Sequence, residues 1–177
     1  TRRWHNPSRR LRLAFSGVVA ATLVVVGYYA FSAQSQVSYD NDLAFTGIDG
    51  KTFSLREFKG RVVIVEYMAT WCPSCNEQVG YLKKVYEKYS RDKVTLVSVT
   101  VDPTSDTPSV LEAYVKDRGI AWIQATDTFD TSLKYKVSII PTLLIIDGNG
   151  VVRYRHTGVI RDLILAQKVS ELLGPRS

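Results

Sequence analysis

Cysteine, histidine and methionine are scarce in this chain of 177 residues, which has two cysteines, two histidines and one methionine. Because Cys72 and Cys75 are the only cysteines, a scaffold of several disulfides and a zinc site of four thiolates are both excluded. His5 and His156 do not form a second pair at zinc spacing, so the sequence predicts no metal and no other cofactor. Any chemistry of the cysteines must come from the pair itself.

Acidic residues are absent from the first twelve positions, which hold five of the 23 basic residues. Without those arginines the chain has 18 basic against 17 acidic residues, so the net charge of +6 is a property of the N-terminus. A basic face for nucleic-acid phosphates is therefore not implied, and we expect no nucleic-acid partner.

Charge is also missing from residues 13–31, whose sequence is LAFSGVVAATLVVVGYYAF. A membrane-spanning helix needs about 20 such residues, so this stretch can just span. Arginines crowd its N-terminal side and Asp40 and Asp42 are the first charges after it, which places the N-terminus in the cytoplasm. We expect a cytoplasmic basic tail at 1–12, a transmembrane helix or signal anchor at 13–31, a linker at 32–38 and an exported domain at 39–177.

A cleaved signal peptide is the alternative interpretation of this stretch, since Ala30-Phe31-Ser32 resembles a processing site. The apolar run is longer than the ~7 to 15 residues of a secretory signal, which favours the anchor. Both interpretations put the domain outside the cytoplasm, and the anchor holds it at the cytoplasmic membrane.

The exported part alternates between strand and helix patterns. The β-branched run at 61–68 (RVVIVEYM) is typical of a central strand covered on both faces. It leads into apolar residues at helical spacing after Trp71, then a second buried strand at 94–101 and a helix at 107–119. This order predicts parallel strands joined by helical crossovers.

The remaining elements are shorter. A first strand is expected at 43–48, with a turn at Asp49-Gly50. After the crossovers the sequence predicts a short strand at 121–125, a helical turn at 127–135, a hairpin of 142–146 with 151–156 and a closing helix at 161–173.

The two cysteines form a Cys-x-x-Cys pair whose first member caps the helix that follows the central strand. Exposed amides at a helix start lower the pKa of the Cys72 thiol, and Pro73 suits a position that has no N–H to satisfy. Cys72 is then the nucleophile and Cys75, one turn further, resolves the mixed disulfide. A structural disulfide or half of a zinc site is the alternative, but the place between strand and helix favours redox chemistry.

The segment 62–75 (VVIVEYMATWCPSC), together with Ile140-Pro141-Thr142, resembles thioredoxin. The segments 47–51 (GIDGK), 53–55 (FSL) and 58–60 (FKG), with the extra helix after residue 101, resemble the membrane-anchored TlpA/ResA branch of that family. The similarity covers roughly residues 38–173. It implies an α/β thioredoxin-like fold, a mixed central sheet flanked by helices, and a thiol-disulfide oxidoreductase.

The resemblance also assigns a role to Glu66, which lies six residues before Cys72. In thioredoxins a buried acid at this place relays a proton to or from the second cysteine, here Cys75, through a water. Burial inside a covered strand should raise the pKa of Glu66 toward neutrality, which supports this role. The alternative is a glutamate at a strand end that reaches solvent or an arginine.

Four more residues are expected to contact the client protein. Pro141 matches the family's cis-proline, which packs against the disulfide, and Ile140 would offer its backbone to an extended client segment. Trp71 would shield the sulfurs, although a core tryptophan is an alternative. Pro73 and Ser74 complete the expected client-binding surface.

Gln78 departs from the pattern of relatives that reduce apocytochrome c, which carry an acid three residues beyond the second cysteine. A role in haem maturation is therefore not favoured.

The function that we expect is reduction of protein disulfides near the membrane, with a membrane electron carrier as redox partner. Potentials in this fold run from about −270 to about −120 mV, and Pro73, Ser74 and Ile140 favour the reducing end. A DsbA-like oxidant remains an alternative. A Sco-like copper-delivery module is the second alternative. The cysteines of Sco-type proteins are spaced C-x-x-x-C, unlike Cys72 and Cys75, and their histidine ligand lies in another region than His156.

Overall fold

The computed structural model describes residues 43–174. The predicted tail, membrane segment and linker lie outside the described residues. Within residues 43–174, none of the helices combines the length and the apolarity that crossing a membrane requires. The elements are β1 (Ala44–Gly47), β2 (Thr52–Ser54), the 3-10 helix η1 (Leu55–Phe58), β3 (Val62–Met68), α2 (Pro73–Lys88), β4 (Val94–Thr100), α3 (Pro108–Arg118), β5 (Ile123–Thr126), α4 (Thr131–Lys134), β6 (Thr142–Ile146), β7 (Val152–Thr157) and α5 (Asp162–Leu173).

The seven strands form one mixed sheet in the order β2-β1-β5-β4-β3-β6-β7. β3, β4 and β5 are parallel, as the alternation of strands and helices predicts, while β6 runs antiparallel to β3 and to β7. β3 therefore lies inside the sheet, between β4 and β6, and its carboxyl end leads directly into the turn before α2.

Every residue of β3 and β4 is buried, because both faces of the sheet are covered. The side chains of β3 alternate between two core clusters, with Ile64 and Met68 in one and Val63 and Tyr67 in the other. This explains why the sequence of the strand is a continuous apolar run. Glu66 occupies a position on the same face as Ile64 and Met68.

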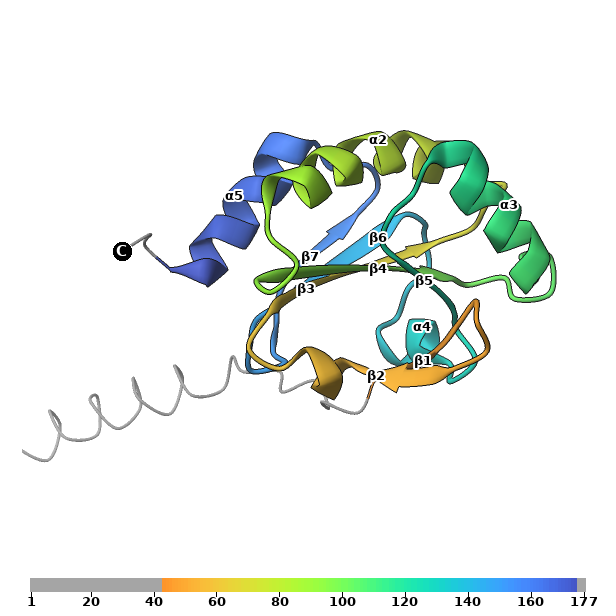
Figure 1. Cartoon of the computed structure of the whole chain (residues 1–177), viewed down its shortest axis with the longest axis horizontal. Helices are drawn as coiled ribbons and strands as arrows, with labels where there is room; N and C mark the ends of the chain where they lie inside the picture. Colours follow the sequence, from red (N-terminus) through yellow and green to blue (C-terminus); the bar gives the residue numbers. More distant parts are fainter. Residues whose placement is uncertain (1–42, 175–177) are drawn as a thin grey trace, which may run out of the picture. The chain divides into compact units, whose positions relative to one another are not determined.

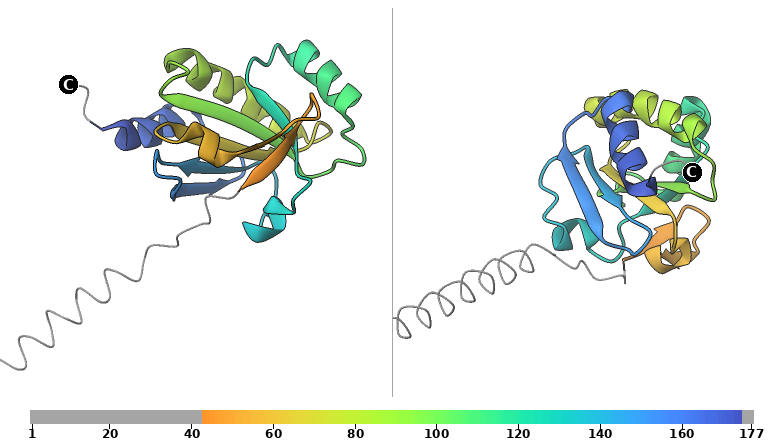
Figure 2. Two further views of the ribbon diagram at one scale, coloured as in Figure 1. Left: turned by 60° about the horizontal axis from the view of Figure 1, so that its bottom comes forward. Right: turned by 90° about the vertical axis from the view of Figure 1, so that its left-hand side faces the viewer.

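Helices α2, α3 and α5 cover the face of the sheet that contains Ile64 (Figure 1). The views in Figure 2 show α2 and α5 side by side over this face. The core cluster on the other face includes Leu55 of η1, Phe45 of β1 and Leu43, the residue before β1. It also includes Tyr135, which directly follows α4. The predicted architecture, a mixed sheet flanked by helices, is confirmed.

The sequence located the crossover helices well, because their ends carry strong local signals. Pro108 is the first residue of α3 and Gly119 ends it in the left-handed conformation at φ 54°. The sequence did not predict η1, whose single turn is too short to show periodicity. There the backbone N–H of Ser54 donates to Glu57 Oε1 at 2.8 Å.

The hairpin between β6 and β7 touches the segment before β3. The backbone N–H of Gly60 donates to the Gly148 carbonyl at 2.9 Å. A Cβ atom on Gly148 would lie 3.1 Å from the backbone of Gly60, which is tighter than van der Waals contact allows without movement. Glycine at position 148 therefore lets two backbones meet at the edge of the core.

We predict that Gly148→Ala destabilises the protein by about 1 to 3 kcal/mol, because backbone atoms cannot yield as a flexible side chain would. Gly80→Ala is the matched control, since Gly80 lies on the exposed side of α2 with open space around its Cβ position. It should stabilise the protein by about 0.5 to 1 kcal/mol through helix propensity. Urea unfolding of the full chain measures both changes, and equal effects of the two would contradict the packing argument.

Candidate redox-active site

Cys72 and Cys75 form a disulfide at the first turn of α2, with their Cα atoms 5.2 Å apart. Cys72 is the N-cap residue and keeps a trace of exposure, 4%, while Cys75 is fully buried. Cys72 is thus the more exposed of the two residues.

Two donors lie next to the Cys72 sulfur. The backbone N–H of Cys75 donates to Cys72 Sγ at 3.2 Å, and the Ser74 hydroxyl lies 3.3 Å from the same atom. Pro73 occupies the first position of the helix, where its missing N–H costs nothing. After reduction, both donors and the helix N-terminus would stabilise a thiolate at Cys72. Ser74 thus has a second role besides the expected contact with a client.

The Ile140–Pro141 loop lies against the disulfide, and its peptide bond is cis. The carbonyl oxygen of Ile140 is 3.9 Å from Cys72 Sγ, which places it within reach of a thiol at that position. Pro141 is buried, and its carbonyl accepts from the backbone N–H of Gly158 at 2.8 Å. The fold thus brings residues 72 and 140, far apart in the sequence, to one site.

Trp71 lies on the surface, with 60% of its area exposed. This excludes the alternative of a core tryptophan. Its indole N–H donates to Asp102 Oδ2 at 3.0 Å. Hydrogen bonds from the backbone and side chain of Ser105 and from the Trp71 indole lower the pKa of Asp102, so its carboxylate is an acceptor at neutral pH. The indole is held while its ring stays available to a client.

Asp106 is a site residue that the sequence analysis missed. It is fully buried and accepts three hydrogen bonds: from Thr70 N at 3.0 Å, Thr70 Oγ1 at 2.5 Å and Thr100 Oγ1 at 2.5 Å. Thr70 lies two residues before Cys72, so Asp106 fixes the turn that presents Trp71 and the disulfide. The only signal in the sequence is an acid before Thr107-Pro108, which also suits an ordinary helix start.

Glu66 is buried in β3, with 1% of its area exposed. This excludes the alternative of a glutamate that reaches solvent. The Ser98 hydroxyl donates to Glu66 Oε2 at 2.6 Å. Burial raises the pKa of Glu66 to about 7, and the hydrogen bond from Ser98 opposes that rise. Glu66 shares its side of the sheet with Cys75, so a group that exchanges protons near neutral pH lies in the same core as the second cysteine.

Gln78 lies one turn beyond Cys75 and is fully buried. Its amide pairs with both backbone groups of Ile160: Nε2 donates to the carbonyl at 3.1 Å, and Oε1 accepts from the N–H at 2.8 Å. An ionised carboxylate could not donate to that carbonyl. The pairing therefore requires an amide rather than an ionised acid at position 78.

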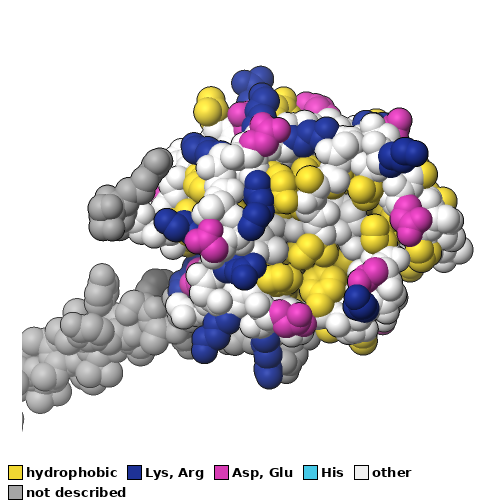
Figure 3. All heavy atoms as spheres, viewed as in Figure 1, with side chains coloured by type: hydrophobic (Ala, Val, Ile, Leu, Met, Phe, Trp, Pro, Cys, Tyr) yellow, Lys and Arg dark blue, Asp and Glu magenta, His cyan; other side chains and the backbone are white. Residues whose placement is uncertain are grey.

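One face of the described part carries charges of both signs. Lysine and arginine alternate with aspartate and glutamate over the face in Figure 3, with apolar side chains between them. Within residues 43–174, no three histidine, cysteine, aspartate or glutamate side chains are grouped to hold a metal ion.

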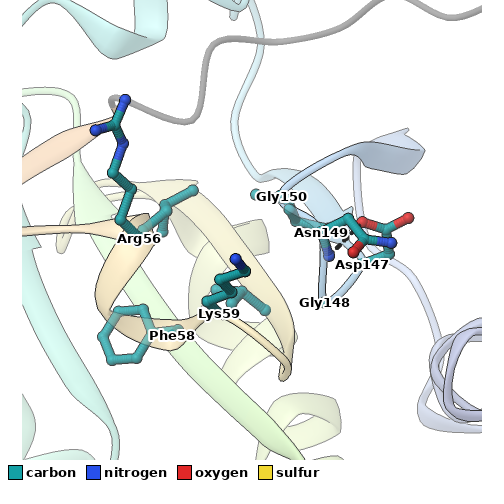
Figure 4. A pocket seen from close by; sticks show the side chains of 10 residues that line it. Arg56, Phe58, Lys59, Asp147, Gly148, Asn149 and Gly150 are labelled. Atoms are coloured by element: carbon teal, nitrogen blue, oxygen red, sulfur yellow. Dashed lines mark hydrogen bonds between the residues drawn. The ribbon is translucent and has the colours of Figure 1, made fainter.

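A cavity of about 390 Å³ lies between η1 and the β6–β7 hairpin (Figure 4). It is formed at the end of the sheet where β3 begins, whereas the disulfide follows the other end of β3. The Asp147 carboxylate on its rim accepts from Asn149 N and Val151 N and pairs with Arg153. Nothing in this cavity resembles the chemistry of the cysteine site.

The sheet order, the disulfide at the start of α2 and the cis-proline beside it define a thioredoxin-like thiol-disulfide oxidoreductase. The family model described as Redoxin matches residues 33–172, and the chain belongs to the Redoxin family. Among curated proteins it is similar to the thiol-disulfide oxidoreductase ResA of Bacillus cereus, at 28% identity over 142 residues that span 79% of this chain and 80% of that protein. The predicted TlpA/ResA type is confirmed.

Solved structures agree with the fold. A thiol:disulfide interchange protein of the thioredoxin family from Chlorobium tepidum is 26% identical, with a TM-score of 0.65 over 76% of this chain and 94% of that chain. A thiol-disulfide isomerase from Corynebacterium glutamicum is 22% identical and has a TM-score of 0.66 over 80% of this chain and 97% of that one.

We predict that Asp106→Asn lowers the free energy of unfolding by about 2 to 3 kcal/mol, because an amide nitrogen replaces an acceptor and leaves buried donors unpaired. Asp117→Asn is the matched control, since the side chain of Asp117 is 79% exposed. Its effect should stay within about 0.5 kcal/mol. Urea unfolding of both variants measures these changes in the free energy of unfolding. If Asp106→Asn left that free energy unchanged, the turn would not depend on the carboxylate.

Glu66 should make stability depend on pH. Its folded-state pKa of about 7 lies above the ordinary value of 4.5, so the native state binds the proton more tightly than the unfolded state does. The contribution of protonated Glu66 to the free energy of unfolding is therefore complete below pH 4.5. It is lost as the pH rises through about 7, where the folded protein releases this proton.

We therefore expect the free energy of unfolding of Glu66→Gln to rise by about 3 kcal/mol relative to that of the parent protein between pH 4.5 and pH 8. The figure follows from the shift of the Glu66 pKa from 4.5 to about 7, at 1.36 kcal/mol per unit. Urea unfolding of the oxidised proteins across this range measures the difference. A constant difference between the two proteins would mean that Glu66 is ionised in the folded state throughout.

Proposed function

We propose that this protein reduces disulfides of client proteins on the outer face of the cytoplasmic membrane, through the Cys72–Cys75 dithiol. The observation that carries the proposal is the environment of the Cys72 sulfur. It is the more accessible cysteine sulfur, it has donors at 3.2 and 3.3 Å, and it adjoins the Ile140 carbonyl.

Reduction of a client follows two exchanges. The Cys72 thiolate attacks one sulfur of the client disulfide, a mixed disulfide forms, and the second client sulfur leaves as a thiolate that takes up a proton. Glu66 then accepts the proton of Cys75, and the Cys75 thiolate attacks Cys72 Sγ. The client's first sulfur leaves and is protonated, so the client gains two electrons and two protons while Cys72 and Cys75 become a disulfide.

Client recognition would use the surface around Cys72. Trp71 and Ile139 are both more than half exposed, at 60% and 59%, and each adjoins a residue of the site, Cys72 and Ile140 respectively, so both offer apolar area to a client there. Ile140 lies between Ile139 and Pro141 and would pair its backbone with an extended client segment. Main-chain pairing of this kind accepts many client sequences, which suits a general reductant.

The location and the direction of electron flow rest on the sequence. Residues 13–31 would hold the domain at the membrane, and the short linker would keep it within reach of a membrane dithiol carrier that returns two electrons. A DsbA-like oxidant would run the same exchanges backwards. Copper delivery is less well supported, since His156 Nε2 lies 3.2 Å from the Val159 carbonyl and its ring stacks on Tyr154.

The test is to replace Cys75 with alanine in the full chain in its native membrane. The variant should accumulate a mixed disulfide between Cys72 and its client, because the resolving thiol is gone. Cys72→Ala is the matched control, since it keeps one thiol but loses the accessible one, and it should trap nothing.

The potential of the parent protein decides the direction. Equilibration with glutathione should give a value between about −270 and −150 mV, whereas a value above about −150 mV would identify an oxidant. Equal trapping by the two cysteine variants would exclude Cys72 as the nucleophile.

A further inference from the structure

The two oxygens of the buried Glu66 carboxyl have different surroundings. Oε2 accepts the hydrogen bond from Ser98 at 2.6 Å. Oε1 has no hydrogen-bond partner among the described residues. Ser98 lies directly opposite Glu66 in the β3–β4 ladder, so the strand register itself brings the hydroxyl to this carboxylate.

A third residue determines the direction of that bond. The indole N–H of Trp122 donates to Ser98 Oγ at 2.9 Å. An indole nitrogen can only donate, so Ser98 must be the acceptor in this pair and keeps its own hydrogen for Glu66. Both Ser98 and Trp122 are buried, with 2% and 8% exposed, so water does not compete for these groups. While Glu66 is ionised it can only accept, so the chain then runs in one direction, from the Trp122 indole through the Ser98 hydroxyl to the Glu66 carboxylate.

We propose that Ser98 and Trp122 are positioning residues that bind Oε2 of Glu66 and so reserve Oε1 as the atom that gains and loses the proton. This inference rests on the proposed function, in which Glu66 accepts the proton of Cys75. In that step the S–H bond of Cys75 breaks and an O–H bond forms at Oε1. Oε2 accepts from Ser98 before and after, so the transfer needs no rearrangement of the hydrogen-bonded chain.

Within residues 43–174 no cation is among the influences on the pKa of Glu66, which makes the Ser98 bond important. The titratable groups facing Glu66 are the cysteines of α2 and Tyr114 of α3, whose own pKa is raised to about 12 by its burial first and by Glu66 second. The Tyr114 hydroxyl donates to Asn76 Oδ1 at 2.8 Å. β6 contributes Leu143 opposite Glu66, and the buried positions of α5 are apolar. Burial and the Ser98 bond are thus the two influences that set the pKa of Glu66.

The experiment measures the titration of Glu66 in the full-length, oxidised protein by infrared difference spectroscopy, with Glu66→Gln to identify its band. Ser98→Ala should move the pKa of Glu66 upward by about one pH unit, because it removes a hydrogen bond to the charged form. Trp122→Phe should move it in the same direction by less, since Ser98 is then free to turn. Ser98→Thr keeps a hydroxyl and should restore the parent value.

The oxidised protein has no proton on Cys75, so this titration does not depend on the proposed function. An unchanged pKa in Ser98→Ala, with circular dichroism showing a folded protein, would overturn the positioning role. The pH profile of the resolving step, measured separately on a preformed mixed disulfide, should shift with the pKa. A shifted pKa with an unshifted profile would support the positioning role and reject Glu66 as the base for Cys75.

Discussion

The structure depends on β3 being buried on both faces and ending directly at the N-terminus of α2. Because the strand lies between β4 and β6 and under the helices, its end is held by main-chain bonds on two sides. The turn that follows must then deliver Cys72 to the same place in every molecule. A helix start at that place supplies amide donors to sulfur, which no strand or loop interior would provide.

Three buried polar side chains near this turn find their hydrogen-bond partners in different ways. Asp106 accepts hydrogen bonds from two threonine hydroxyls and one backbone N–H. The side-chain amide of Gln78 pairs with the backbone N–H and carbonyl of Ile160, and Glu66 accepts one hydrogen bond, from the Ser98 hydroxyl. Both carboxylate oxygens of Asp106 accept hydrogen bonds and hold the turn at Thr70, and the paired amide of Gln78 holds the segment at Ile160 to α2. Burial raises the pKa of Glu66 to about 7 against a single hydrogen bond from Ser98, so its protonated and ionised forms are close in free energy near neutral pH. Glu66 is thus the one of the three whose charge changes near neutral pH.

The segments that surround the disulfide meet at the carboxyl ends of the parallel strands. The turn after β3 carries Trp71 and the disulfide, and the loop after β4 carries Asp102 and Asp106, which hold that turn. The Ile140–Pro141 loop enters β6 at the same edge, since β6 runs antiparallel to β3. One end of the sheet therefore combines the disulfide, the exposed Trp71 and the cis-proline loop, while the cavity beneath η1 lies at the opposite end.

The sequence alone determined the alternation of strands and helices, the hairpin at Asp147–Gly150, and the cysteine pair at a helix start, because each depends on neighbours within a few residues. It also marked Glu66, since an acid inside a covered strand is physically costly. The tertiary structure alone decided that Ser98 and Trp122 reach Glu66, that Asp106 holds Thr70, and that Gln78 pairs with Ile160. These contacts join residues 24 to 82 positions apart through strand register and helix packing, and no local pattern encodes such distances.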